Sequence, residues 1–305
     1  MQLTKIEKEM IGCDLGSNTI RIVQIDCKTR QRVKEFERIV KTGHNLHKTK
    51  IISETSVQNI LNALKDASKS IGFKKHNTKC VTTEALRIAK NSKQVLEKIY
   101  NNFGLDFKII SGEQEAKYTI LGVKAALSEK DIDEDSFAIF DLGGGSTELS
   151  YIKDENISTK SFPFGILNTH EKYGNKLEKK IKKELEPLQS FADKHKKPDF
   201  LVATAGTPTT VCAFLQGMDY TSYNYKKING KTLHVKDFLK AYEMISSLSK
   251  KEQERFCGTN RSGLIKTGII IIVNLMQAIG FEKCIVIDDG LREGVALSLC
   301  TNKGE

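Results

Sequence analysis

Two stretches of the chain match one another: Cys13-Asp14-Leu15-Gly16-Ser17-Asn18-Thr19-Ile20-Arg21 and Phe140-Asp141-Leu142-Gly143-Gly144-Gly145-Ser146-Thr147-Glu148. Each ends an apolar run and opens an alternating one, which predicts a β-hairpin. In each copy an Asp after a buried strand is followed by Gly and small hydroxyl residues. Such a turn offers backbone N–H and side-chain O–H groups to an anion, and glycine permits close backbone approach. The repeat therefore predicts two phosphate-binding turns.

The two copies lie over a hundred residues apart. The plainest architecture is therefore two similar domains whose hairpin tips face one another across a cleft that holds a phosphate ligand. A single Asp-x-Gly turn is a common connection between strands, so the interpretation depends on the pairing. The paired hairpins resemble those of the actin-like superfold of sugar kinases, Hsp70 and actin. This resemblance implies an α/β fold with two actin-like, ribonuclease H-like domains flanking an interdomain active-site cleft.

The composition is that of a folded protein with excess positive charge. The chain has 305 residues, 39% of them apolar, which is enough to fill the cores of two ordinary domains. Its 48 Lys and Arg residues outnumber 38 Asp and Glu residues and give a formal charge of +10. This charge suits a polyanion such as polyphosphate, a nucleotide or a nucleic acid. A lysine-rich solvated surface is the simpler explanation of the charge alone, and both explanations stay open.

Cysteine spacing and hydropathy bear on the compartment. The seven cysteines are scattered without the spacing of a zinc or redox site, and we expect a reducing cytoplasm. Residues 1–8 are charged and lack the apolar core of a secretion signal. The most apolar stretch, 264–279, contains Lys266, Asn274 and Gln277 and falls short of a spanning length. We expect a buried helix there and no membrane contact.

Periodicity predicts the remaining elements. Helices are expected at 53–71, 85–90, 92–103, 112–127, 175–195, 235–248 and 291–299, with Ser92 as an N-cap and a kink or break at Pro187. Strands are expected at 79–83, 107–110, 200–204 and 284–288, besides the hairpins within 11–38 and 137–152. The acidic stretch 128–136 is the expected domain junction, and we expect hinge motion near 125–136. The predicted domains are 1–126 and 127–291.

Six short motifs follow one another along the chain: Asp14-Leu15-Gly16-Ser17-Asn18-Thr19-Ile20-Arg21, Thr83-Glu84-Ala85-Leu86-Arg87-Ile88-Ala89-Lys90-Asn91, Ile109-Ile110-Ser111-Gly112-Glu113-Gln114-Glu115-Ala116, Asp141-Leu142-Gly143-Gly144-Gly145-Ser146-Thr147-Glu148-Leu149, Ala203-Thr204-Ala205-Gly206-Thr207 and Asp289-Gly290-Leu291-Arg292-Glu293-Gly294. They resemble, in the same order, motifs of the exopolyphosphatase/guanosine pentaphosphate phosphatase (Ppx/GppA) family. The resemblance covers nearly the whole chain and is to the short, two-domain form, because longer members carry an additional helical domain. It implies that a closing helix, about 292–305, packs back onto the first domain.

The resemblance implies removal of a terminal phosphate from polyphosphate or pppGpp by water. Carried onto this chain, it makes Glu115 the catalytic base and Arg87 a contact of the departing phosphate. Glu115 comes near the start of an expected helix, where we expect its carboxylate to be held at a cleft rather than buried. Alternatively, Glu115 is only an acid at the start of a helix, where the helix dipole stabilises its charge, and Glu113 would serve that role equally well.

The resemblance also implies a Mg²⁺ ion held by Asp141 and Glu148, with Asp14 in the matching role on the first turn. Mg²⁺ keeps much of its hydration and takes few protein carboxylates. Asp14 or Asp141 could instead cap its turn by accepting backbone N–H bonds. The implied phosphate-binding residues are Ser17, Asn18, Thr19, Arg21, Gly144, Gly145, Ser146 and Thr147. No nucleophilic side chain is required, because positioning and electrostatics carry most of phosphoryl transfer.

Two positions depart from related proteins. Kinases and chaperones of the superfold carry a Gly-Gly pair where this chain has Ala205-Gly206-Thr207-Pro208, and the difference favours a phosphatase over an ATP-dependent kinase. Glu84 stands where family members often have a small hydroxyl residue. Its charge beside Arg87 is expected to weaken the phosphate contact.

Three functions remain open: an exopolyphosphatase, which we favour; a pppGpp 5′-phosphohydrolase, which would belong to the stringent response; and a non-catalytic polyphosphate or nucleotide sensor. The three acids Glu115, Asp141 and Glu148 argue against a pure sensor. The expected partners are inorganic polyphosphate or (p)ppGpp, with no specific nucleic acid. A homodimer is one expectation, since dimers are common in the family. Without the helical extension we expect a preference for short chains or nucleotides.

Overall fold

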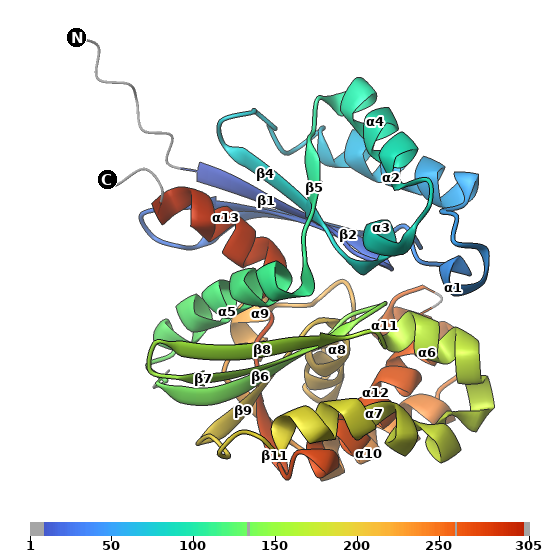
Figure 1. Ribbon diagram of the computed structural model, residues 1–305, viewed down its shortest axis with the longest axis vertical. Helices are drawn as coiled ribbons and strands as arrows, with labels where there is room; N and C mark the ends of the chain where they lie inside the picture. Colours follow the sequence, from blue (N-terminus) through green and yellow to red (C-terminus); the bar gives the residue numbers. More distant parts are fainter. Residues whose placement is uncertain (1–8, 133–134, 260, 302–305) are drawn as a thin grey trace. The chain divides into compact units, whose positions relative to one another are not determined.

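The computed structural model describes residues 9–132, 135–259 and 261–301 (Figure 1). The chain divides into two compact units, Met1–Ala125 with Gly290–Glu305, and Ala126–Asp289. The first boundary falls inside helix α5 (Gly112–Ser128), and the second lies directly before α13 (Leu291–Thr301). Residues 1–8, residues 133–134 of the expected junction and hinge, and residues 302–305 of the expected closing helix lie outside the described residues.

The first unit contains a five-stranded mixed sheet in the order β3-β2-β1-β4-β5. Its strands are β1 (Glu9–Leu15), β2 (Thr19–Asp26), β3 (Arg32–Ile39), β4 (Thr78–Thr82) and β5 (Phe107–Ile109). The first three strands pair antiparallel as consecutive hairpins, whereas β4 and β5 continue the sheet parallel to β1. β1 is almost wholly buried, as expected for a central strand covered on both faces.

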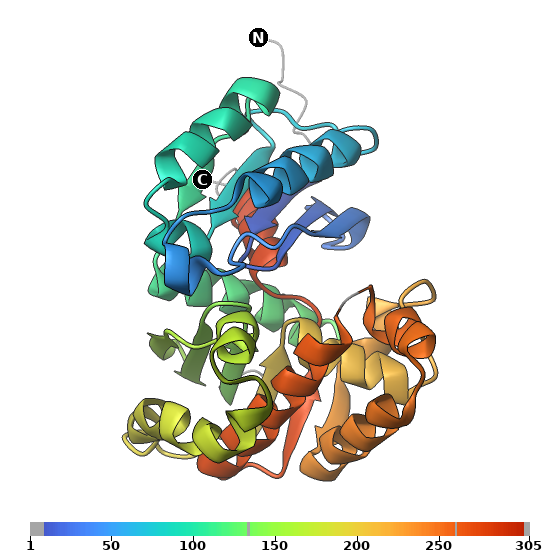
Figure 2. The same cartoon turned by 90° about the vertical axis from the view of Figure 1, so that its right-hand side faces the viewer.

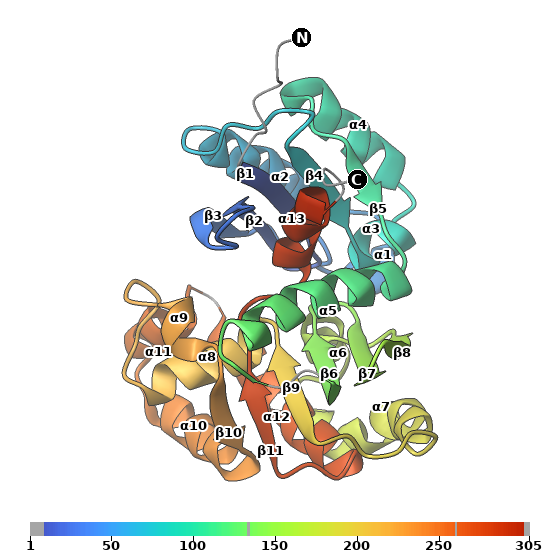
Figure 3. The same cartoon turned by 90° about the vertical axis from the view of Figure 1, so that its left-hand side faces the viewer.

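Helices cover both faces of this sheet. α2 (Glu54–Ala67) and α4 (Ser92–Phe103) pack on one face (Figure 2), and α13 packs on the other (Figure 3). Two short helices complete this part of the chain: α1 (Leu46–Thr49) precedes α2, and α3 (Glu84–Ile88) lies between α2 and α4. Ser53 caps α2 by accepting the N–H of Ser56 at 3.2 Å. The predicted cap at Ser92 was wrong: Ser92 is the first helical residue, and Asn91 holds the cap position without a side-chain bond.

α13 crosses β1 at a glycine. A Cβ atom on Gly12 would lie 2.1 Å from the carbonyl oxygen of Arg292, so the crossing admits no larger residue. The carboxylate of Glu293, only 1% exposed, accepts the N–H of Gly290 at 2.9 Å and pairs with Arg32 at 3.3 Å. The Gly-Leu-Arg-Glu-Gly motif thus anchors α13 to the sheet of the first unit.

A disulfide bond adds a covalent link to this anchor. It joins Cys27, directly after β2, to Cys300 in the last turn of α13. The two residues are separated by 273 positions, so no short spacing of cysteines in the sequence indicates the pair. The other five cysteines are free and buried.

The second unit contains a six-stranded sheet in the order β10-β11-β9-β6-β7-β8. Its strands are β6 (Ser136–Leu142), β7 (Thr147–Lys153), β8 (Asn156–Phe162), β9 (Phe200–Thr204), β10 (Lys231–His234) and β11 (Lys283–Val286). The helices are α6 (Ile166–Tyr173), α7 (Leu177–Ala192), α8 (Gly206–Leu215), α9 (Tyr225–Ile228), α10 (Val235–Ser247), α11 (Lys250–Cys257) and α12 (Ser262–Ala278), with a 3₁₀ turn at Gly174–Lys176.

The two sheets share one topology. The order β8-β7-β6-β9-β11 repeats β3-β2-β1-β4-β5, with the same antiparallel hairpins and the same parallel additions. The second sheet adds only β10, antiparallel to β11, at its edge. The predicted α/β fold with a repeated hairpin unit is confirmed. The prediction that the two turns face one another across a cleft stays a prediction.

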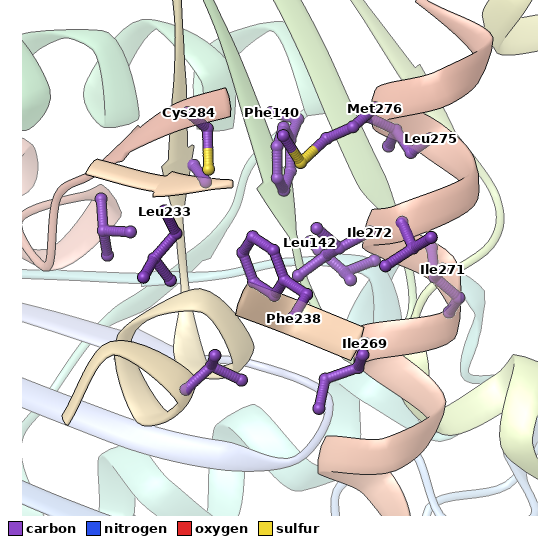
Figure 4. Packing of buried hydrophobic residues seen from close by; sticks show 14 of the residues in the cluster. Phe140, Leu142, Leu233, Phe238, Ile269, Ile271, Ile272, Leu275, Met276 and Cys284 are labelled. Carbon is purple, nitrogen blue, oxygen red and sulfur yellow. The ribbon is translucent and has the colours of Figure 1, made fainter. Parts of the chain in front are cut away.

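The core of the second unit forms around α12 (Figure 4). Ile269, Ile272 and Met276 from this helix pack in one cluster with Phe140 and Phe238. The apolar stretch at 264–279 is therefore the buried helix that we expected. No helix among the described residues is long and apolar enough to cross a membrane.

The lysine-rich helix α7 also follows its predicted pattern on the buried side. Leu177, Ile181, Leu185 and Leu188 are buried in the same core. Of the predicted kink or break at Pro187, the break was wrong, because the helix runs through this residue to Ala192, and the kink stays a prediction. Burial of the apolar face outweighs the loss of one backbone hydrogen bond.

Candidate functional site: two phosphate-type turns and an Arg–Glu pair

The two hairpin turns have the same backbone hydrogen bond. The N–H of Gly16 donates to the carbonyl of Thr19 at 2.9 Å, and the N–H of Gly143 donates to the carbonyl of Ser146 at 3.0 Å. The strand registers also agree, with Asp14 opposite Arg21 in one hairpin and Asp141 opposite Glu148 in the other. The sequence match thus extends to the geometry of each turn.

The carbonyl groups of each turn are held by the segment that follows the third strand. In the first unit, Ser17 accepts from the N–H of Gly43 at 2.7 Å, and Asn18 accepts from the N–H of Val40 at 2.9 Å. In the second unit, the N–H groups of Ile166 and Leu167 donate to Gly143 at 2.9 Å and to Gly144 at 2.8 Å. In each unit, the segment after the third strand therefore holds the turn in place by donating hydrogen bonds to its carbonyl oxygens.

The tips of the two turns also carry backbone N–H groups, which can donate hydrogen bonds. Across residues 9–132, 135–259 and 261–301, those of Ser17, Asn18, Gly144 and Gly145 donate no hydrogen bond to another residue. Backbone N–H groups in such a turn are typical ligands of phosphate oxygens. This arrangement can bind an anion at each tip.

Gly165 is a site residue that the sequence analysis missed. A Cβ atom there would lie 2.6 Å from the carbonyl carbon of Gly144 and 2.6 Å from the nitrogen of Gly145. Gly165 donates its N–H to the side chain of Asn168 at 2.7 Å, and Asn168 donates in turn to the carbonyl of Gly145 at 2.7 Å. Close backbone approach requires glycine at this position, and no hairpin pattern signals it.

Three segments of the first unit end at one edge of its sheet. β1, β4 and β5 run parallel, with Leu15 opposite Thr82 and Thr82 opposite Ile109. The first turn follows β1, α3 follows β4, and α5 follows β5. In open α/β sheets, ligands bind at the carboxyl ends of the strands. The topology thus brings the turn, Arg87 and Glu115 to the same edge.

Arg87 and Glu115 form an ion pair. The Nη1 atom of Arg87 lies 3.0 Å from Oε2 of Glu115 and donates to the carbonyl of Ile110 at 2.7 Å. The Nε atom of Arg87 donates to Glu84 at 3.2 Å. Sequence reasoning had placed Glu84 beside Arg87, and the structure shows this contact. It also shows a link between Arg87 and Glu115 that the sequence does not reveal.

The surroundings of Glu115 differ from the expected ones. We expected a carboxylate held at a cleft rather than buried, but Glu115 is only 8% exposed. Its partner explains the difference, because a carboxylate is buried at acceptable cost when a guanidinium donates to it. Glu113, the alternative helix-start acid, is exposed.

The predicted metal residues of the second turn lie side by side. Asp141 and Glu148 are directly opposite one another in the register of β6 and β7, so their side chains extend from the same face of the sheet. Glu148 is buried and accepts the hydroxyl of Ser161 at 2.6 Å, whereas Asp141 is half-buried. Asp14 has the equivalent place in the first unit, where its neighbour is Arg21.

The remaining predicted phosphate-binding side chains differ in exposure. Asn18 and Thr19 are half-buried, and Ser17 and Ser146 are 6% and 3% exposed. Arg21 pairs with Glu37 of β3 at 3.1 Å. Thr147 is fully buried and its hydroxyl donates to the carbonyl of Phe164 at 2.7 Å; its role in phosphate binding stays a prediction. Thr147 therefore fastens the turn to the loop behind it.

Cys13 lies directly before Asp14 but is not a candidate nucleophile. Burial and a hydrogen bond with Cys80 raise the pKa of the Cys13 thiol well above its usual value.

Ala205 has an unusual backbone at the carboxyl end of β9. Its φ of 76° and ψ of −174° lie in a region that glycine adopts and other residues avoid. Ala205 begins the segment 205–208 that the sequence comparison sets against the Gly-Gly pair of kinases and chaperones. Ala205 adopts this strained conformation although it is not glycine.

The model of the Ppx/GppA phosphatase family matches residues 21–303. The chain belongs to the Ppx/GppA phosphatase family. The predicted family is thereby confirmed, and with it the prediction of an enzyme of the phosphatase type. The first turn up to Ile20 precedes the matched range.

Relatives and solved structures agree with the family. A bifunctional 3-dehydroquinate synthase/phosphatase of Fusobacterium nucleatum is 27% identical over 95% of this chain, which spans 46% of that protein's length. Exopolyphosphatase 2 of Mycobacterium tuberculosis is 23% identical over 98% of this chain and 99% of its own. The structure of the Aquifex aeolicus family member is 29% identical, covers 97% of this chain and 99% of its own, and has a TM-score of 0.75. An exopolyphosphatase structure from Cytophaga hutchinsonii, 19% identical with a TM-score of 0.82 over 96% and 98% of the two chains, shows the same fold.

Proposed function

We propose that this protein hydrolyses the terminal phosphoanhydride bond of inorganic polyphosphate. Water forms the new P–O bond, the bridging P–O bond breaks, and the products are orthophosphate and a chain one unit shorter. The observation that carries the proposal is the pair of turns whose tip N–H groups donate to no described residue, in a chain of a phosphatase family. Such groups suit the oxygens of a phosphate chain.

Glu115 takes the proton of the attacking water. Its position supports this role, because it belongs to the sheet edge at which the first turn also ends. Arg87 orients the carboxylate by donating to Oε2, and a base acts only when it is held within hydrogen-bond reach of its proton. Arg87 could also exchange its contact with Glu84 for a phosphate oxygen, which would place positive charge where negative charge develops.

Asp141 and Glu148 are the residues that would hold Mg²⁺, with Asp14 in the matching place on the first turn. The donor set fits this ion, because two carboxylates extend from one face of the hairpin and Mg²⁺ takes few protein carboxylates. Among the described residues there is no group of three or more His, Cys, Asp or Glu residues of the kind that encloses a structural metal. When bound, the ion would offset phosphate charge and polarise the scissile group.

The pppGpp 5′-phosphohydrolase reaction is the same chemistry on a nucleotide. The exopolyphosphatase name of the Mycobacterium tuberculosis relative, which this chain covers almost completely, favours polyphosphate. The cytoplasmic location and the homodimer remain predictions.

The test compares phosphate release from short polyphosphate, long polyphosphate and pppGpp, with Mg²⁺ and with EDTA. We expect release from polyphosphate that depends on Mg²⁺, at a higher kcat/KM than from pppGpp. Faster release from pppGpp would replace the proposed substrate by the nucleotide. Binding of polyphosphate without release of phosphate from any substrate would favour the sensor instead.

A further inference from the structure

A basic cavity of about 600 Å³ lies in the second unit, away from the hairpin turn. Three segments line it: the chain just after α5, the end of α8, and the stretch from α9 into β10. The lining residues are Lys130, Ile132, Gln216, Lys226, Lys227, Asn229, Gly230 and Lys231. Four of these eight are lysines, and none is acidic.

The four lysines lack acidic partners within the part of the chain that the structure describes. In residues 9–132, 135–259 and 261–301, none of their ammonium groups forms an ion pair. The single side-chain bond among them runs from Nζ of Lys130 to the carbonyl of Lys226 at 3.2 Å. By contrast, Lys172 in the same unit lies 2.8 Å from Glu184. Like charges in one cavity repel one another, and an anion there would remove the repulsion.

One wall of the cavity is held in place from within the fold. Asn229 is 5% exposed; its side chain donates to Asp289 and accepts the N–H of Asp288 at 2.6 Å. Gly230 has a φ of 85° and donates its N–H to Val286 at 3.0 Å. Lys231 then begins β10, which pairs with β11. The backbone that carries three of the lysines is therefore positioned before any ligand arrives.

The lining indicates the class of ligand. None of the eight lining residues is aromatic, so the lining itself offers a nucleobase no ring to stack on; the ring centroid of Tyr225, which is not a lining residue, lies 5.9 Å from Nζ of Lys226. Lysines bind phosphate as flexible point charges, and the amides of Gln216 and Asn229 are the remaining polar side chains. A chain of several linked phosphates, with a charge on each unit, matches four ammonium groups better than a single small anion does.

We propose that this cavity binds inorganic oligophosphate at a site separate from the hairpin turn. In the second sheet β10 and β6 are three strand spacings apart, roughly 14 Å, so the cavity and the turn at Asp141 are distinct. The site would hold a polyphosphate chain on the second unit whether or not the protein hydrolyses it. The proposed binding site therefore does not depend on the proposed hydrolysis of polyphosphate.

The test uses tripolyphosphate with EDTA present, so that binding is measured without added metal. Hydrogen exchange of the segment 225–233 in the whole protein should slow when tripolyphosphate is added, and the double variant Lys227→Ala/Lys231→Ala should lose this protection. The same variant should bind tripolyphosphate at least tenfold more weakly at this segment. The matched control is Lys179→Ala/Lys183→Ala on α7, where both lysines are exposed and outside the cavity.

The proposal would be overturned if tripolyphosphate left hydrogen exchange at 225–233 unchanged, or if it protected this segment equally in the wild type and in the cavity variant. It would also be overturned if the α7 control lost as much protection as the cavity variant, because that would indicate general charge attraction. Tighter protection by GTP than by tripolyphosphate would also contradict an inorganic ligand. All four lysines are exposed, so the variants should keep the thermal stability of the wild type. The conservative single variant Lys227→Gln provides a second check, with a smaller loss expected.

Discussion

The guanidinium of Arg87 donates to the carboxylate of Glu115 at 3.0 Å while its other side contacts Glu84. Arg87 comes from α3 and Glu115 from α5, and the two helices follow neighbouring parallel strands. The pair therefore connects the residue proposed as the base to a residue proposed for phosphate. Variants of Arg87 and Glu115 should distinguish the positioning of the proposed base from the binding of substrate.

Replacing Arg87 by Ala should lower both activity and stability. Glu115 would lose the partner that offsets its burial, and we expect a loss of about 3 kcal/mol in the free energy of unfolding. We expect kcat to fall on the order of 100-fold. If Arg87 also contacts the phosphate, KM for polyphosphate rises in Arg87→Lys. Arg255→Ala removes an exposed arginine that pairs with Asp219 and should leave kcat unchanged. Wild-type kcat in Arg87→Ala would contradict a role for the pair.

Gly165→Ala tests the support behind the second turn. The added methyl group would collide with the backbone of Gly144 and Gly145, so the turn must move. We expect activity to fall at least tenfold and the midpoint of thermal unfolding to decrease. Gly72→Ala is the control, because a Cβ atom there meets nothing within 4 Å. Equal behaviour of the two variants would show that the turn geometry is unimportant.

Ala205→Gly should stabilise the protein. The backbone at Ala205 costs on the order of 1–3 kcal/mol for a residue with a side chain, and glycine removes part of that cost. We expect the free energy of unfolding in urea to rise by about 1 kcal/mol, despite the greater freedom of glycine in the unfolded chain. Ala213→Gly in the interior of α8 should instead lower it by about 1 kcal/mol. A decrease in the free energy of unfolding of both variants would contradict a strained backbone at Ala205.

The Cys27–Cys300 bond predicts a thiol count and a stability change. Unfolded without reductant, the protein should show five reactive thiols, and after reduction it should show seven. Reduction should lower the free energy of unfolding by about 2–4 kcal/mol, because the bond restricts a long loop of the unfolded chain. Cys300→Ser should show a similar loss and no further response to reductant. Seven thiols before reduction would show that the bond does not form.

Much of the fold could be predicted from the sequence because the signals are local. The two hairpins and α2 follow from the spacing of apolar residues, and the buried helix α12 follows from an apolar run that is too short to span a membrane. The boundaries of α4 and β9 were also predicted within a residue. Such periodicity reports which face of an element is buried and is visible in one short window.

The misses arise where distant segments meet. Nothing near Cys27 indicates that Cys300 will lie beside it, and nothing near Gly165 indicates that its backbone will contact Gly144. Nothing in the sequence near Thr147 indicates that its hydroxyl will donate to the carbonyl of Phe164. The burial of Glu115 likewise depends on a partner 28 positions away. These features require the tertiary structure.

The most direct test of the central claim is phosphate release from polyphosphate by Glu115→Gln, measured beside the wild type and Glu113→Gln. Glu113 lies in the same first turn of α5 but is exposed, so it controls for the helix-start charge. We predict that Glu115→Gln loses a factor of about 10²–10⁴ in kcat while polyphosphate still binds, and that Glu113→Gln keeps wild-type kcat. Equal turnover by Glu115→Gln and the wild type would contradict the assignment of Glu115 as the base.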